Sequence, residues 1–294
     1  LVRLRFLMPT RATRRLWFAA PVVAGLLVFG LLSKQAAGVN ASLAKAHEAY
    51  ANIAQMVAAD LRPGDRVWLN GADYAEAYAI HDPDPARVFS LPALPASDAE
   101  ADATLALAAA GASRIHVLYY GERAADPASS YERWLAGHAF KAREQWVGDI
   151  RFATYALRDG LPRVTAGAAW RAGISLSSAA ADLSDVGAGD IIPLALVWTA
   201  SNTSATNYSI FIHLGPADGP PVAQNDAAPA GGFRPIASWR RGEAISDKRG
   251  VMIPSATPTG RYTLFVGLYD PVTGERLKLV SGADRFALGQ VTVR

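Results

Sequence analysis

The stretch IIPLALVWTA, residues 191–200, decides the fold of the C-terminal part of the chain. Leu194, Leu196 and Trp198 alternate there with smaller or polar residues. The stretch YTLFVGLY, residues 262–269, repeats this alternation. A period of two places every second side chain on the same face of a strand, so both stretches predict β-strands with one buried face.

Shorter strand patterns surround these two stretches. We expect further strands at residues 174–177, 208–214, 221–224, 251–254, 277–280 and 291–293. Turn-forming sequences separate them: GAGD at 187–190, GPP at 219–221 and DPVTG at 270–274. Short, regularly spaced strands with such turns predict an all-β sandwich over residues 168–294, joined to the preceding part by a linker at 159–170.

Residues 40–158 show a different pattern, in which strands alternate with helices. We expect strands at 66–69, 87–91 and 114–120, helices at 41–60, 74–80, 97–110 and 131–140, and a terminal hairpin over 145–157. This order predicts a small α/β domain with a Rossmann-like, mostly parallel sheet. After the first strand the sequence reads NGAD, residues 70–73, and carries no glycine-rich phosphate-binding motif.

The beginning of the chain predicts a membrane anchor. Residues 16–32, LWFAAPVVAGLLVFGLL, contain no charge, and five arginines precede them while only Lys34 follows closely. We expect a transmembrane helix at 16–33, a cytoplasmic basic segment at 1–15, and the bulk of the chain outside the cytoplasm as a single-span cell-membrane protein. A cleaved signal peptide with its cleavage site near residues 36–38 is the main alternative, and a buried core helix is a third.

Composition excludes several classes of protein. The formal net charge is +3, but without the five arginines of residues 1–15 the rest carries −2, so no nucleic-acid partner is expected. The absence of cysteine excludes disulfides, thiolate metal sites and cysteine nucleophiles. The five histidines are not at metal-ligand spacing, and Ser175 does not lie in a G-x-S-x-G motif. We therefore assign no catalytic residue, no metal site and no cofactor.

The segment WRRGE, residues 239–243, is the candidate ligand-binding spot. Most aromatic residues of the C-terminal part lie on predicted strands, where they are expected to fill the core. Trp239, Arg240 and Arg241 lie in a predicted loop instead. An exposed indole beside two guanidinium groups could stack on a sugar ring, so these three residues are the predicted binding residues.

Seven stretches, covering most of residues 40–294, carry a family resemblance. They are RPGDRVWL at 62–69, LYYGERAADP at 118–127, YERWLAGH at 131–138, WVGDIRFATY at 146–155, NYSIFIHL at 207–214, PVAQND at 221–226 and VGLYDPVTGER at 266–276. Together they resemble the C-terminal extracytoplasmic region of bacterial multi-span glycosyltransferases of the dolichyl-phosphate-mannose-protein mannosyltransferase type.

The resemblance implies a polyprenyl-phosphate-linked sugar donor and transfer outside the cytoplasm. In that family the catalytic carboxylate lies in the first extracytoplasmic loop of a multi-span body that this sequence lacks, so no catalytic residue is carried over. We expect the chain to be the tail of such an enzyme, accessory to catalysis, with a transmembrane body upstream of Leu1. The alternative is a stand-alone single-span protein that binds a glycan or a protein, and a soluble hydrolase is the third hypothesis.

Overall fold

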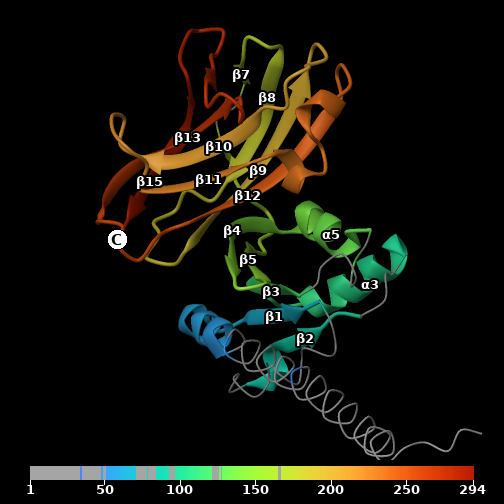
Figure 1. Cartoon of the computed structure of the whole chain (residues 1–294). Coiled ribbons are helices and arrows are strands. Elements are labelled where there is room, and N and C mark those ends of the chain that lie inside the picture. Colours follow the sequence, from blue (N-terminus) through green and yellow to red (C-terminus); the bar gives the residue numbers. More distant parts are fainter. Residues whose placement is uncertain are drawn as a thin grey trace, which may run out of the picture. The chain divides into compact units, whose positions relative to one another are not determined.

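The computed structural model describes residues 51–70, 84–92, 97–120, 128–164 and 167–294, together with Lys34, Glu48, Tyr78 and Asp126. Residues 52–294 form one compact unit, and every strand named below belongs to it. Figure 1 shows this unit as a lower part with helices and an upper part built of strands.

The upper part, called here the two-sheet region, consists of two sheets facing each other. The first is antiparallel and five-stranded, in the order β11-β10-β13-β14, with β15 also paired to β13. Facing it are β12, β9, β8, β7 and β6, which belong to a larger sheet. The bounds are β6 Arg163–Val164, β7 Ala168–Ala169, β8 Ile174–Ala181, β9 Ile191–Ala200, β10 Ser209–Gly215, β11 Ala223–Ala227, β12 Ala244–Met252, β13 Gly260–Tyr269, β14 Arg276–Leu277 and β15 Phe286–Val293.

One apolar core lies between these two sheets. Leu194, Leu196 and Trp198 of β9 are fully buried in it, while the residues between them are partly exposed. Ile212 of β10 and Val266 of β13 reach the same core from the opposite sheet. Burial of each large aliphatic side chain contributes about 1.5–3 kcal/mol, so the alternation in sequence is what holds the sheets face to face.

The lower part contains a sheet with helices on both faces. Strands β1 (Asp65–Leu69), β2 (Val88–Ser90) and β3 (Arg114–Tyr120) are parallel, and β4 (Phe140–Val147) and β5 (Ile150–Ala156) form an antiparallel hairpin. Helices α3 (Asp98–Ala109) and α5 (Ser130–His138) pack on one face, where Leu105 and Leu135 join a buried cluster. The helical residues 51–60 reach the other face through Met56 and Asp60. Three 3-10 turns also lie among the described residues: η1 Pro85–Arg87, η2 Pro229–Gly232 and η3 Ile236–Ser238.

The prediction of a Rossmann-like, mostly parallel sheet is wrong. The sheet is mixed, because β5 pairs antiparallel with both β3 and β4. It also continues into the two-sheet region, since β12 pairs in parallel with β4 at Arg249 and Lys141. The resulting ten-stranded sheet has the order β2-β1-β3-β5-β4-β12-β9-β8-β6, with β7 on β8. The chain reverses direction in a tight turn at Gly148, whose φ is +60°. No crossover helix therefore separates β4 from β5, and the two strands are antiparallel.

The prediction of a single-span membrane protein is also contradicted. Among the described residues, no helix is long and apolar enough to cross a bilayer. The predicted span at 16–33 and the predicted basic segment at 1–15 lie outside the described residues. The predicted domain limits, 40–158 and 168–294, stay predictions.

Candidate functional site

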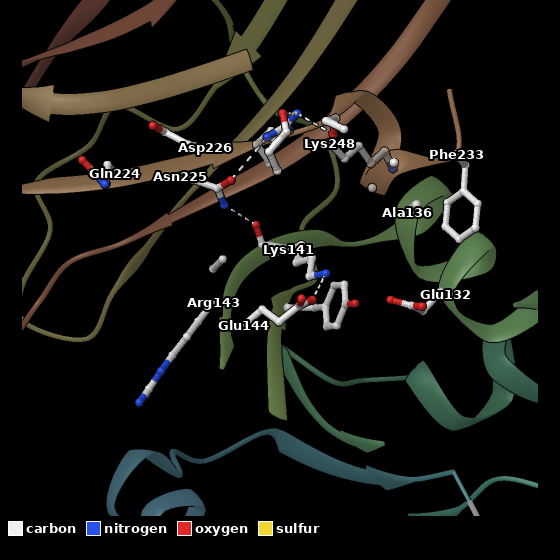
Figure 2. A pocket seen from close by; sticks show the side chains of 17 residues that line it. Glu132, Ala136, Lys141, Arg143, Glu144, Gln224, Asn225, Asp226, Phe233 and Lys248 are labelled. Atoms are coloured by element: carbon white, nitrogen blue, oxygen red, sulfur yellow. Dashed lines mark hydrogen bonds and ion pairs between the residues drawn. The ribbon is translucent and has the colours of Figure 1, made fainter. Parts of the chain in front are cut away.

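A polar cleft with a volume of about 600 Å³ opens where the lower part meets the two-sheet region. A volume of this size lies within the range of roughly 300–1,000 Å³ that is typical of small-ligand sites. Helix α5 and strands β4 and β5 form one wall, and β11, β12 and the η2 loop form the other (Figure 2). The side chains that line it include Glu132, Lys141, Glu144, Tyr155, Gln224, Asn225, Asp226, Phe233, Lys248 and Arg249.

An irregularity in β4 aims two charged side chains into the cleft. Lys141 pairs with Tyr155 and Arg143 pairs with Thr154, so Ala142 is an extra residue in the ladder. Such a bulge reverses the alternation of faces beyond it. Lys141 and Glu144 therefore lie on one face and form an ion pair, whereas Arg143 turns away, as Figure 2 shows.

The carboxylates of this wall are held by a buried arginine. Nη1 of Arg151 donates to Oε1 of Glu132 at 2.8 Å and to Oε2 of Glu144 at 2.9 Å. The same guanidinium lies over the ring of Tyr119, 4.1 Å from its centroid. Burial alone would raise the pKa of Glu144, but Lys141 and Arg151 outweigh it and lower that pKa. Glu144 is therefore ionised at neutral pH, which suits it to accept hydrogen bonds and not to act as a general acid.

Asn225 joins the two walls of the cleft. Its Nδ2 donates to the carbonyl of Lys141 at 2.8 Å and to the carbonyl of Gly250 at 2.7 Å. Beside it, Nε of the buried Arg249 donates to both carboxylate oxygens of Asp247, at 2.9 and 3.0 Å. Asp247 also accepts from the backbone N–H of Ala230, so the η2 loop is tied to β12. Asn225, Arg249 and Glu144, which bound the cleft, are thus each held in place by two or more contacts.

The far end of the cleft holds one cation and one aromatic ring. Lys248 of β12 extends along the cleft, and Phe233 lies beyond it, next to Ala136 of α5 (Figure 2). The φ of Gly231, +66°, is a left-handed value that glycine adopts readily. A Cβ on Gly231 would lie 3.4 Å from the Cβ of Ala136, so the η2 loop lies close to α5 at this point.

The predicted binding residues Trp239, Arg240 and Arg241 lie away from this cleft. Trp239 is 2% exposed, belongs to the core between the sheets, and donates from Nε1 to the carbonyl of Arg234 at 2.8 Å. Its ring is therefore not available to stack on a ligand in this conformation. Arg240 and Arg241 are exposed, and neither lines the cleft. A binding role for this segment stays a prediction.

A buried group resembles a catalytic relay, but its histidine and its threonine do not reach the cleft. His116 Nδ1 lies 3.2 Å from Oγ1 of Thr154, and its Nε2 lies 3.3 Å from Oδ2 of Asp65. Both His116 and Thr154 are fully buried, and neither lines the cleft. A nucleophile needs contact with substrate, so this arrangement is best explained as a buried polar network that stabilises the sheet.

Metal ligation has no support in the described part of the chain, where no group of three or more histidine, aspartate or glutamate side chains could hold an ion. The sequence also has two aspartates at 82 and 84, a spacing found in some cation sites. Only Asp84 of the two lies among the described residues, and it forms an ion pair with Arg87.

Sequence reasoning missed the residues of the cleft. In the sequence, Lys248 lies far from Lys141 and Glu144, and all three belong to ordinary strand patterns. Each of them alone looks like a charged side chain that is exposed to solvent. One signal was available: Arg143, Glu144 and Gln145 are three consecutive polar residues that interrupt the alternation of β4. Such an interruption is what a bulge produces.

Comparison with known proteins gives only distant likenesses. No family model matches the chain, and no curated protein matches it. Among solved structures, the C-terminal domain of wzt is 13% identical, with 45% of this chain and 81% of that one covered and a TM-score of 0.33. A Niemann-Pick type C2 protein from the Japanese carpenter ant is 10% identical, with 46% and 99% covered and a TM-score of 0.29. At these scores neither likeness bears on the function, and the mannosyltransferase-type resemblance stays a prediction.

Proposed function

We propose that the chain is a glycan-binding protein that holds a saccharide in the cleft without converting it, as an accessory to the transfer of a lipid-linked sugar. One observation carries the proposal: the cleft presents hydrogen-bond donors on both walls and carboxylate acceptors on one, and several of these side chains are held in place by ion pairs. On one wall the carboxylate of Glu144 accepts and the ammonium of Lys141 donates, and on the other wall Lys248 donates.

A sugar ring matches this arrangement because each hydroxyl both donates and accepts hydrogen bonds. Side chains that are already held in place lose little conformational entropy when they bind such a ligand. Glu132 and Glu144 are held in this way by Arg151, and Lys141 by Glu144. Phe233 adds an apolar surface at the far end, against which the C–H face of a sugar ring could pack.

The ion pairs favour binding over hydrolysis. A glycoside hydrolase of the common type needs one carboxyl that stays protonated near neutral pH. Glu144 has a lowered pKa, and Glu132 shares the same guanidinium nitrogen of Arg151. The carboxyl of Glu144 therefore stays ionised near neutral pH, so we propose that the ligand leaves the cleft unchanged.

The link to glycosyl transfer rests on the resemblance. Several residues of the cleft fall inside the stretches that carry it: Glu132 in 131–138, Tyr155 in 146–155, and Gln224 to Asp226 in 221–226. This coincidence supports a role in which the chain holds either the sugar of a polyprenyl-phosphate-linked donor or the acceptor glycan. A stand-alone glycan-binding protein would use the same cleft.

Calorimetric titration of the purified full chain tests the proposal. The ligands are a panel of mannose, glucose and galactose oligosaccharides and a short-chain polyprenyl phosphate mannose. We expect at least one saccharide to bind, and Phe233→Ala to weaken binding about fivefold, since an aromatic contact is worth roughly 1 kcal/mol. Trp146→Ala is the matched control, because Trp146 is an exposed aromatic residue outside the cleft.

Three results decide between the hypotheses. Binding of the polyprenyl-linked mannose above that of free mannose supports the role in lipid-linked transfer, whereas equal binding supports the stand-alone protein. No binding across the panel, or a Phe233→Ala variant that binds as well as wild type, overturns the proposal.

A further inference from the structure

Most charged side chains of the cleft form ion pairs. The cation that remains, Lys248, indicates which class of ligand the cleft takes. Each of the other cations in or behind the lining has a carboxylate partner within ion-pair distance. The pairs are Lys141 with Glu144, Arg143 with Asp60, Arg151 with Glu132 and Glu144, and Arg249 with Asp247. Among the described residues, no such pair includes Lys248; only the charge of Asp159 acts on it, from farther away.

Lys248 is one of the residues that line the cleft, and its ammonium group packs against one aromatic ring. Nζ lies 5.4 Å from the centre of the ring of Phe140, which is buried. A cation over an aromatic face is attracted to it, but the ring occupies only one side of the ammonium. The three N–H donors are directed by a flexible stem, so those on the other side can reach a ligand in the cleft. Figure 2 shows the side chain running along the cleft toward Phe233.

Burial also makes this cation a strong site for an anion. Lys248 is half-buried, and the loss of hydration lowers its pKa below the ordinary value. A poorly hydrated ammonium gains more from an anionic partner than a fully exposed one, because less water must be removed.

We propose that the saccharide held in the cleft carries a negatively charged group, a carboxylate or a phosphate, that pairs with Nζ of Lys248. This inference rests on the proposed glycan binding and adds to it the class of ligand. The paired carboxylates on the opposite wall, Glu132 and Glu144, then face the hydroxyls of the sugar, and the charged group lies at the Lys248 end. A ligand placed the other way round would bring its anion against those two carboxylates.

Titration with matched sugars tests this inference on the purified full chain. Mannose, glucose and galactose are each compared with their own uronate and their own 6-phosphate. We expect a charged form to bind about tenfold tighter than its neutral parent, as one charge-assisted contact allows. The preference between uronate and phosphate identifies which anion the cleft takes. Lys248→Gln should bind the charged and the neutral forms equally, and Lys248→Arg should keep the preference.

Lys278→Gln is the control, because Lys278 is an exposed lysine outside the cleft. If Lys248→Gln does not fold, titration of the wild-type chain at increasing salt still tests the inference. Added salt should weaken the binding of the charged sugars and leave the binding of the neutral sugars unchanged. Neutral sugars that bind as tightly as charged ones, or a preference that persists in Lys248→Gln, overturn the inference while glycan binding stands. Failure of every form to bind overturns both.

Discussion

Asp65 is a charged residue in a fully buried position, and its partners explain why it is tolerated. Its carboxylate accepts from Nη2 of Arg114 at 2.6 Å and from the backbone N–H of Arg62 at 2.8 Å, and it lies 3.3 Å from Nε2 of His116. Burial alone would raise the pKa of Asp65, but these hydrogen bonds lower it to about 2. The folded state therefore favours the ionised form more strongly than the unfolded state does.

The first prediction concerns acid stability. Because the folded-state pKa of Asp65 lies below its unfolded value, its contribution is present above about pH 4 and is lost as the pH falls toward 2. We expect this loss to be about 2 kcal/mol of the free energy of unfolding. Asp65→Asn should remove that part of the pH dependence and destabilise the protein by about 3–5 kcal/mol at pH 7, because Arg114 loses its counter-charge.

Urea unfolding at pH 2 to 7 measures both effects. Asp218→Asn, which changes an exposed aspartate, serves as the control and should follow the wild-type curve. Curves for wild type and Asp65→Asn that stay parallel down to pH 2 would contradict this account of Asp65.

The burial of Trp239 could not be predicted from the residues next to it in the sequence. A tryptophan followed by two arginines looks like an exposed loop residue, and no periodic pattern places it on a strand. In the structure it fills a gap in the core while its neighbours stay outside. Burial of this kind depends on packing between the sheets, which a local sequence does not contain. The strand residues Leu194 and Val266 could be placed correctly because alternation encodes their face.

At the scale of the element, the bulge in β4 decides which side chains reach the cleft. If Ala142 were paired like its neighbours, strict alternation would put Lys141 and Glu144 on opposite faces of the sheet. The hairpin of β4 and β5 could be predicted from the sequence, although it begins earlier than residue 145, because strands joined by a short turn have a clear local pattern. The bulge could not be placed, because one extra residue is invisible until the register of both strands is known.

The second prediction follows from this bulge. Deleting Ala142 should return β4 to regular pairing and keep Lys141 and Glu144 on the same face, because they would then lie two residues apart. We expect saccharide binding to persist, because both the ion pair and the wall of the cleft remain. Ala142→Gly, which keeps the extra residue, is the control and should also bind. Circular dichroism and urea unfolding establish that the deletion variant is folded, and a folded deletion variant that no longer binds would contradict this account of the bulge.

At the scale of the whole molecule, the lower part and the two-sheet region share one sheet. Besides the pairing of β12 with β4, Nη2 of Arg62 donates to the carbonyl of Ala188 at 2.7 Å, and Nη1 of Arg114 donates to the carbonyl of Gly189 at 3.3 Å. The sequence predicted two separate folds because strand order along the chain changes character near residue 160. It could not show that β12 returns to the edge of β4, since such long-range pairing leaves no local pattern.

The third prediction is that residues 52–294 unfold in one cooperative transition. Hydrogen exchange of the full chain at increasing urea should give the same midpoint for peptides of β1 to β5 and for peptides of β8 to β13. Asn225→Ala removes donors to two carbonyls at the shared edge, so it should lower the stability of both regions by about 1–3 kcal/mol. Asn202→Ala, in an exposed loop, should leave both midpoints unchanged. Two separate midpoints in the wild-type chain would contradict the prediction.

The two hydrogen bonds of Asn225 also bear on when the cleft is completed during synthesis of the chain. The amide spans 84 residues of chain to reach Lys141, and its other partner, Gly250, is made later still. A ribosome that has completed only the helices and the first five strands has therefore produced one wall of the cleft and nothing opposite it. The cleft is complete only after β12 has emerged and docked, so premature termination before that point yields a product that lacks one wall of the cleft.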